Sequence, residues 1–303
     1  MCPFPSKFAA VLSLATCALA QAMPLPHYDH VVVVIMSSHS PDTIIGSASA
    51  PYINGTLLPA GARFSAASTL YAPEQPNYIV LLAGDNLGVT NNACNTPNTT
   101  TSTLPRELVS AALSFADFSE DLPAAGDTSC TSGDYTRSHN PVTDFSDLPA
   151  SMNQPYTAFT AALANNTLPT VSYVIPNICH DMKGESIGGS NCPQTFSNLV
   201  ALGDAWLSSN IPPLLSSADA KSTLLIITWD IGDAGFSGNS AQIPVIFVGP
   251  HVKTGYTSPV AINHLAILRL IEDLYAVPEL RSAATAAQIT DVFDDVIFKD
   301  SFE

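Results

Sequence analysis

The chain has 303 residues, with 10 Lys or Arg against 26 Asp or Glu, and a formal net charge of −16. Such an excess of negative charge argues against nucleic acid or an anionic lipid surface as a partner, because both would repel the chain. The length allows one large domain or two small ones. An anionic small substrate would need a metal ion or a local group of basic residues at its site.

An apolar segment, residues 8–20, follows Lys7 and ends in small residues. This pattern is typical of a secretory signal peptide that is cleaved after Ala20 or Ala22. The segment is too short for a membrane span. A lipoprotein signal ending at Cys17 is an alternative, but the Thr before that Cys fits it poorly. We therefore expect a secreted or periplasmic protein.

Cleavage would remove residues 1–22 and leave 23–303, in which we find no repeats and no linker that would divide the chain. The sequence thus predicts a single domain, with an acidic peripheral tail at 291–303. Because Lys7 leaves with the signal peptide, the mature chain is one charge more negative than the whole sequence. No second apolar stretch is long enough to cross a membrane.

The predicted elements alternate between helices and strands. The first is a strand at 31–36, where an unbroken apolar run rich in β-branched residues is typical of a strand buried on both faces. Asn263 is the expected N-cap of the last helix. The other elements, in chain order, are a short helix near 50–54, an extended segment 63–71, helices 76–84 and 106–113, a strand 115–118, a helix 156–164, a strand 170–175, a helix 196–209, strands 224–229 and 245–248, and a helix 264–275. This alternation predicts an α/β fold, a mainly parallel central sheet with helices on both faces.

Four cysteines remain after cleavage: Cys94, Cys130, Cys179 and Cys192. An even number of cysteines in an exported chain predicts two disulfide bonds. Of the three pairings, we favour Cys94–Cys130 and Cys179–Cys192, because each pair brackets loop-rich sequence. A metal site is the alternative, although no Cys-x-x-Cys spacing occurs.

In open α/β sheets, ligands are held at the carboxyl ends of the central strands. Ser37 and Ser38 follow the first strand, so neither an acid nor a metal-ligating carboxylate stands there. Ser38, His39 and Ser40 suggest a Ser/His hydrolase, but residues adjacent in one turn seldom converge as nucleophile and base.

Short motifs in a fixed order give the chain its similarity to a known family. They are Ala50–Asn54, Gln75–Tyr78, Ser119–Pro123, Tyr135–His139, Val174–Asn177, Asp181–Met182, Gly203–Leu207, Thr228–Asp230, Gln242–Pro244 and Leu270–Tyr275. With them the chain resembles the phosphoesterase family of secreted acid phosphatases and bacterial non-haemolytic phospholipases C, from about His30 to Phe293. The resemblance implies an alkaline-phosphatase-like three-layer fold. It also implies a serine nucleophile at a helix N-terminus, opposed by a metal ion, that hydrolyses phosphoesters through a phosphoenzyme.

At the reactive positions the chain departs from the family. It has Ser37 and Ser38 where the family has Glu-Asn at the metal, and Glu74 where the family has the nucleophilic Ser. Lys183 replaces a His, Ile231 replaces a Glu, and Asn263 stands where Asp is usual. The family residues that are retained are Asn77, Arg137, His139, Asp181, Asp204, Asp230 and His264.

These substitutions predict an altered site. The Glu74 carboxylate would occupy the place of the phosphate and repel it, although an acid before a helix is also favoured by the helix dipole, by about 0.3–1 kcal/mol. Asp230 is the clearest surviving metal ligand, so we expect no cofactor, with a divalent metal as the alternative. We expect Lys183 near the former metal position, paired with Glu74 or Asp230, and the alternative is a solvated charge.

Our first hypothesis is a secreted pseudophosphatase or binding protein, whose ligand would be a small phosphate ester or another small molecule. Its ligand-binding candidates are Ser37, Ser38, Asn77, Arg137 and Lys183. The second hypothesis is an active, atypical phosphoric-ester hydrolase, a phosphomonoesterase or phospholipase C-like enzyme.

The catalytic candidates of that enzyme are His139, Asp181 and His264, together with Asp230. The two histidines have an alternative role as polar residues that are merely satisfied by their neighbours. A third hypothesis is an acyl or glycosyl hydrolase that uses Glu74 with a second carboxylate. Three N-x-Ser/Thr sequons, at Asn54, Asn98 and Asn165, matter if the host glycosylates its exported proteins.

Overall fold

The computed structural model describes residues 25–94, 102–184, 192–193, 195–233 and 241–294. The expected signal peptide, the tail from residue 295 and the sequon at Asn98 lie outside these residues. No helix in the described part of the chain has the length and apolar character needed to cross a membrane.

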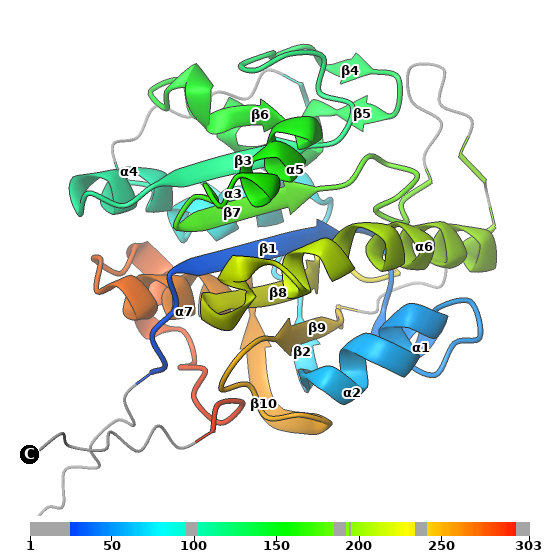
Figure 1. Ribbon diagram of the computed structural model, residues 1–303. Coiled ribbons are helices and arrows are strands. Elements are labelled where there is room, and N and C mark those ends of the chain that lie inside the picture. The colour runs from blue at the N-terminus through cyan, green and yellow to red at the C-terminus, as the bar shows by residue number, and fades with distance from the viewer. Residues whose placement is uncertain (1–24, 95–101, 185–191, 194, 234–240, 295–303) are drawn as a thin grey trace, which may run out of the picture.

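An eight-stranded sheet forms the centre of the fold, in the order β10-β2-β9-β8-β1-β7-β3-β6 (Figure 1). Its strands are β1 (His30–Met36), β2 (Ala62–Ser68), β3 (Phe115–Ser119), β6 (Asn153–Pro155), β7 (Val171–Ile175), β8 (Thr223–Trp229), β9 (Val245–Val248) and β10 (Tyr256–Asn263). Five of its seven strand pairings are parallel, and β9 runs antiparallel to both β2 and β8. A separate hairpin pairs β4 (Thr131–Ser132) with β5 (Tyr135–Thr136).

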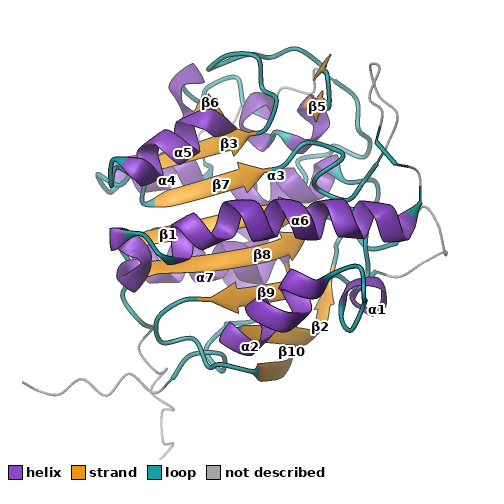
Figure 2. Ribbon diagram, turned by 45° about the vertical axis from the view of Figure 1, so that its right-hand side comes forward, coloured by secondary structure: helices purple, strands orange, loops and turns teal. Residues whose placement is uncertain are grey.

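Helices cover both faces of this sheet. They are α1 (Pro41–Ile44), α2 (Leu58–Ala60), α3 (Gln75–Ala83), α4 (Leu104–Ser110), α5 (Tyr156–Ala164), α6 (Phe196–Leu215) and α7 (His264–Tyr275). Figure 2 shows α5 and α6 in front of the sheet, with α3, α4 and α7 behind it. A π-helix spans Ile53–Leu57, and short 3-10 helices span Arg137–His139, Pro141–Asp144, Ala150–Met152, Ala218–Ser222 and Arg281–Thr285. The three-layer α/β architecture predicted from the sequence is therefore confirmed.

The central strand β1 is buried as its composition predicts. Every residue from Val31 to Met36 is fully buried, and β1 pairs in parallel with β7 on one side and β8 on the other. β-Branched side chains pack well on both faces of such a strand, because helices close off both sides from water.

The short elements α1, β4, β5 and β6 are absent from the prediction, and two longer elements also differ from it. The helix α6 continues through Pro212 and Pro213 to Leu215 instead of ending at 209. Both prolines are exposed, so the carbonyl groups that lose an N–H partner to them face the solvent side of the helix. The strand β10 was not predicted because it contains Pro259, which the fold places at a register shift of this edge strand, where proline is tolerated.

Both favoured disulfide bonds are present. Cys94 pairs with Cys130, with Cα atoms 5.5 Å apart, and Cys179 pairs with Cys192, with Cα atoms 5.1 Å apart. The first joins the segment after α3 to the residue just before β4, and the second joins two residues that follow β7.

Asp204 on α6 holds the start of the π-helix. Its carboxylate accepts the backbone N–H groups of Tyr52 at 2.9 Å and Ile53 at 2.8 Å, and the residue is almost fully buried. We predict that Asp204→Asn lowers the free energy of unfolding by about 1–3 kcal/mol, because one buried N–H loses its charged acceptor. Urea unfolding measures this value. Ser208→Ala, on the exposed side of α6, is the control, and a loss no larger than that of the control would contradict the role of Asp204.

Candidate functional site

The site lies where the carboxyl ends of β1, β7 and β8 meet. Ser37 follows β1, Asp181 lies in the loop after β7, and Asp230 follows β8. The Ser37 N–H donates to the Asp181 carbonyl oxygen at 2.7 Å, and the Asp230 N–H donates to the Met36 carbonyl oxygen at 2.8 Å. These backbone bonds extend the parallel pairing past the strand ends and bring the three loops together.

Glu74 immediately precedes α3, a helix whose nine residues are all buried. The turn before it is held by Asn77, whose Oδ1 accepts the N–H groups of Leu70 and Tyr71 and whose Nδ2 donates to the Tyr71 carbonyl oxygen. Asn77 was predicted to contact a ligand. In the structure its amide fixes the backbone that presents Glu74.

Glu74 and Lys183 form an ion pair that is almost fully buried. Lys183 Nζ donates to Glu74 Oε1 at 2.8 Å, and Asn92 Nδ2 donates to Oε2 at 2.5 Å. Burial acts to raise the pKa of Glu74, but the charges of Lys183 and His139 and these hydrogen bonds lower that pKa to about 2. Glu74 is therefore ionised at any physiological pH.

A buried histidine connects the two other carboxyl groups. His139 stacks on the Tyr78 ring, and its Nδ1 lies 2.8 Å from Asp181 Oδ2. Its Nε2 lies 3.9 Å from Asp230 Oδ2. Burial acts to lower the pKa of His139, but the bond to Asp181 and the charge of Asp181 raise it above its ordinary value. The bond to Asp181 therefore makes the protonated form of His139 more favourable than in a free histidine.

Asp230 shows the opposite effect of burial on charge. Full burial, together with the charges of Glu74 and Asp181, raises the pKa of Asp230 to about 7, although the charges of His139 and Lys183 act to lower it. Near neutral pH the Asp230 carboxyl group is therefore protonated in some molecules and ionised in others. His139 and Asp230 together can hold and exchange a proton.

Ser37 and Ser38 lie at the same edge. Ser38 has a φ of 59°, its N–H lies 3.3 Å from Asp230 Oδ1, and its hydroxyl lies 3.1 Å from the Ser37 hydroxyl. Ser40 contacts Asp233, whereas His39 Nδ1 lies 3.2 Å from the Ser37 carbonyl oxygen. The fold does not bring this Ser-His-Ser stretch together as a nucleophile and its base.

Two further predicted residues act within the scaffold. His264 begins α7, and its Nε2 lies 2.9 Å from the Trp229 carbonyl oxygen at the end of β8. Burial lowers the pKa of His264 to about 4, so this ring is neutral and donates to that carbonyl. The Arg137 guanidinium donates to the carbonyl oxygens of Thr128 and Thr143 and thereby joins two loops.

Sequence reasoning missed Asn92 and Asp233. Asn92 contacts Glu74 through its Nδ2 and accepts the Gln75 N–H through its Oδ1, and no motif singles it out. Asp233 accepts the Ser40 N–H at 2.9 Å and the Ser40 hydroxyl. The sequence did contain a signal for Asp233, because it is a second acidic residue that follows Asp230 within the same loop.

The described residues do not fit a divalent metal ion of the kind the resemblance implies. Both carboxylate oxygens of Asp181 already have hydrogen-bond partners, His139 Nδ1 and the Lys183 N–H. The side chain of Ile231 has no atom that could bind a metal. The Lys183 ammonium lies close enough to Asp230 to lower its pKa, and its positive charge would repel a cation bound there. Asp134, Cys179 and Cys192 also lie together, but both sulfurs are bonded to each other and cannot act as thiolate ligands.

The arrangement of strands and helices is similar to that of solved structures in the alkaline phosphatase superfamily. A superfamily protein from Vibrio parahaemolyticus has a TM-score of 0.60 and 12% identity, covering 86% of this chain and 70% of that one. A sulfatase structure from Bacteroides thetaiotaomicron has a TM-score of 0.60 and 13% identity, covering 83% and 72%. At such low identity these likenesses define the fold.

Sequence comparison defines the family. The chain belongs to the Phosphoesterase family, whose family model matches residues 56–278. It is 39% identical over 274 residues to a phosphatidylinositol-3-phosphatase of Mycobacterium tuberculosis. The match covers 90% of this chain and 86% of that protein. It is also 24% identical over 235 residues to an acid phosphatase of Aspergillus fumigatus, covering 73% of this chain and 49% of that one.

We predict that Lys183→Met destabilises the fold because it leaves the Glu74 carboxylate buried without its cation. Such a loss costs about 3–5 kcal/mol for a fully buried pair, and less here because about a tenth of each side chain is exposed. The double variant Glu74→Gln, Lys183→Met should recover much of the loss. Urea unfolding of all four members of the cycle measures the coupling, and additive losses would contradict it.

The low pKa of Glu74 predicts a loss of stability in acid. Because the folded-state pKa of about 2 lies below the ordinary value of 4.5, the stabilisation is complete above pH 4.5 and falls away toward pH 2. Unfolding followed between pH 2 and 6 should show a steeper acid loss for the wild type than for Glu74→Gln. Parallel curves for the two proteins would show that Glu74 is not held ionised.

Proposed function

We propose that this chain is an exported member of the Phosphoesterase family that has lost efficient phosphoester hydrolysis and acts as a pseudophosphatase or binding protein. The observation that carries the proposal is the 2.8 Å ion pair between Lys183 Nζ and Glu74 Oε1 at the start of α3. The family resemblance assigns this position to the nucleophile, and the ion pair holds its side chain as a carboxylate.

A carboxylate here opposes catalysis in two ways. It lacks the hydroxyl that would attack phosphorus, and its negative charge stands at the helix start where the phosphoryl oxygens would bind. Lys183 further keeps this carboxylate occupied. The pair places a negative group beside a positive one, as a phosphorylated nucleophile beside a cation would be. Both groups are permanent parts of the chain.

The charges of the buried residues support the same proposal. The Lys183 ammonium is already paired with the Glu74 carboxylate, and His139 is bonded to Asp181. Positive groups that are paired with buried carboxyl groups are poorly placed to attract a dianionic phosphate ester.

The second candidate is an active, atypical phosphoric-ester hydrolase. Its support is the proton-handling pair of His139 and Asp230, and the naming of the two curated relatives as phosphatases. Such an enzyme would use activated water, with His139 or Asp230 moving the proton. The substrate would be a small phosphate ester. The third idea, in which Glu74 works with a second carboxylate, is disfavoured because Lys183 and Asn92 hold its two oxygens.

We also propose export to an oxidising compartment. The two disulfide bonds are of the kind that persist in secreted or periplasmic proteins. The apolar segment 8–20 would provide the signal. Residues 23–303 would then form the mature chain, and we expect that chain to work without a cofactor.

We predict that the purified protein hydrolyses 4-nitrophenyl phosphate no faster than a Glu74→Ala, Asp230→Ala double variant, at any pH from 4 to 9. The reason is that neither the nucleophile nor the charge arrangement for an incoming phosphate is present. The assay is run with and without added Mg²⁺, Ca²⁺, Mn²⁺ and Zn²⁺. The double variant, purified in parallel, defines the background from host phosphatases.

Glu74→Ser alone should stay inactive, because the other substitutions at the site remain. Robust hydrolysis of 4-nitrophenyl phosphate by the wild type, unchanged in Glu74→Ala, would contradict the pseudophosphatase proposal. If His139→Ala then abolished that turnover, the second candidate would replace it. Elemental analysis of the purified protein checks the metal prediction, and we expect less than one equivalent of any divalent metal.

A further inference from the structure

One sequon lies in an exposed turn at the end of α5. Asn165 is the C-cap of this helix, and Asn166 and Thr167 complete the sequon. All three residues are exposed. Thr167 N–H closes the turn by donating to the Ala162 carbonyl oxygen at 2.9 Å, and its hydroxyl points back to the same oxygen at 3.3 Å. The turn thus presents the asparagine on the surface with the sequon hydroxyl nearby.

The Asn165 side chain has one amide hydrogen to spare. Its Nδ2 donates to the Ala161 carbonyl oxygen at 2.8 Å, an exposed interaction along the last turn of the helix. A primary amide carries two hydrogens on nitrogen, so this bond engages one of them. The other can be replaced by a sugar without breaking a contact of the fold.

The sequon at Asn54 has the opposite environment. Asn54 Nδ2 donates to the carbonyl oxygens of Ile44 at 2.9 Å and Ala50 at 2.8 Å, and its Oδ1 accepts the Gly46 N–H at 2.6 Å. Both amide hydrogens are therefore used to close the loop after α1. A sugar on this nitrogen would replace one of them and leave a carbonyl group unpaired.

We propose that Asn165 carries an N-linked glycan when the chain passes through a glycosylating secretory pathway, and that Asn54 does not. The donor is a lipid-linked oligosaccharide pyrophosphate. A bond forms between Asn165 Nδ2 and C1 of the first sugar, the bond from C1 to the pyrophosphate oxygen breaks, the lipid pyrophosphate leaves, and the amide releases a proton. A chain modified at Asn54 would not complete the loop after α1 and would be absent from the folded, secreted product. The proposal rests on export, which is part of the proposed function.

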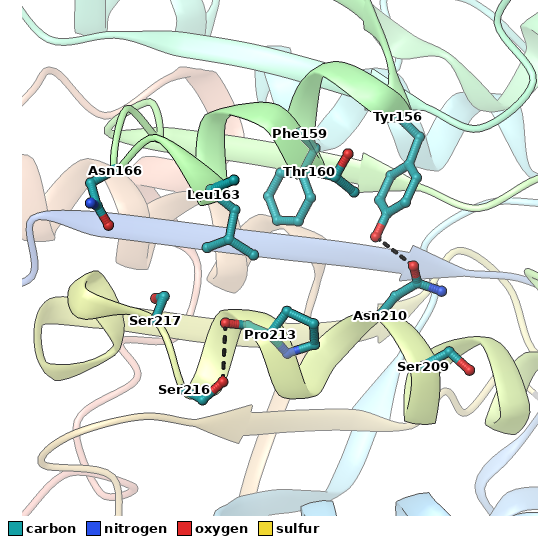
Figure 3. A pocket seen from close by; sticks show the side chains of 11 residues that line it. Tyr156, Phe159, Thr160, Leu163, Asn166, Ser209, Asn210, Pro213, Ser216 and Ser217 are labelled. Carbon is teal, nitrogen blue, oxygen red and sulfur yellow. Dashed lines mark hydrogen bonds between the residues drawn. The ribbon is translucent and has the colours of Figure 1, made fainter.

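The glycan would lie away from the candidate site. The end of α5 leads into the start of β7, so Asn165 lies near the amino ends of the strands (Figure 1). Glu74 lies near their carboxyl ends. Ala164 and Asn166, the neighbours of Asn165, line a groove of about 580 Å³ between α5 and α6. Figure 3 shows Tyr156, Phe159, Thr160 and Leu163 facing this groove, whereas Asn165 is not among its lining residues.

The test is site-by-site peptide mapping of the full chain secreted by yeast or insect cells. Peptide N-glycosidase converts a glycan-bearing asparagine to aspartate, and mass spectrometry reads each peptide separately. We expect aspartate at position 165 and unchanged asparagine at position 54. A parallel sample carries an added host export signal before Met1. If secretion occurs only in that sample and Asn165 is glycosylated there, the export proposal fails and the glycan proposal stands.

Two matched variants remove one sequon each and keep its asparagine. Thr167→Ala should abolish the modification at Asn165, and Thr56→Ala, at an exposed residue, should leave the glycan pattern and the secreted yield unchanged. Unmodified Asn165 in the secreted wild type would overturn the proposal. So would a glycan on Asn54 in protein whose thermal midpoint equals that of the Thr56→Ala variant.

Discussion

The ion pair between Glu74 and Lys183 is the constraint on which the candidate site depends. Glu74 stands at the start of α3, on one face of the sheet, and Lys183 comes from the loop after β7. Their contact therefore ties a helix to the edge of the sheet. Since either charge alone would be buried without a partner, the two positions constrain each other, and a change at one requires a change at the other.

The rest of the buried network adjusts its protons to this pair. Asp181 holds His139 through Nδ1, which leaves Nε2 facing Asp230. Burial and the charges of Glu74 and Asp181 favour a proton on Asp230, whereas the charge of His139 opposes it. His139, Asp181 and Asp230 thus lie together as one buried group of ionisable side chains.

Membership in the Phosphoesterase family and the substitutions at the site are compatible because they concern different parts of the fold. The family model matches residues 56–278, a range that includes the turn held by Asn77 and Asp204, which holds a helix start. The reactive positions lie in loops at the strand ends, which tolerate replacement without disturbing the core. A scaffold can therefore keep its family pattern while its chemistry changes.

The sequence by itself determined the α/β class, β9, α5 and α7 to the residue, and the two disulfide pairs it favoured, because apolar periodicity and loop-rich spacing are local signals. It also placed Lys183 near Glu74 or Asp230, but could not choose between them, since 109 residues separate Lys183 from Glu74. Only the tertiary structure decided that choice, by packing the start of α3 beside the loop after β7. It also decided that the amide of Asn77 serves the backbone and that Asn92 completes the Glu74 site, because hydrogen-bond partners are set by proximity in space and leave no periodic trace in the chain.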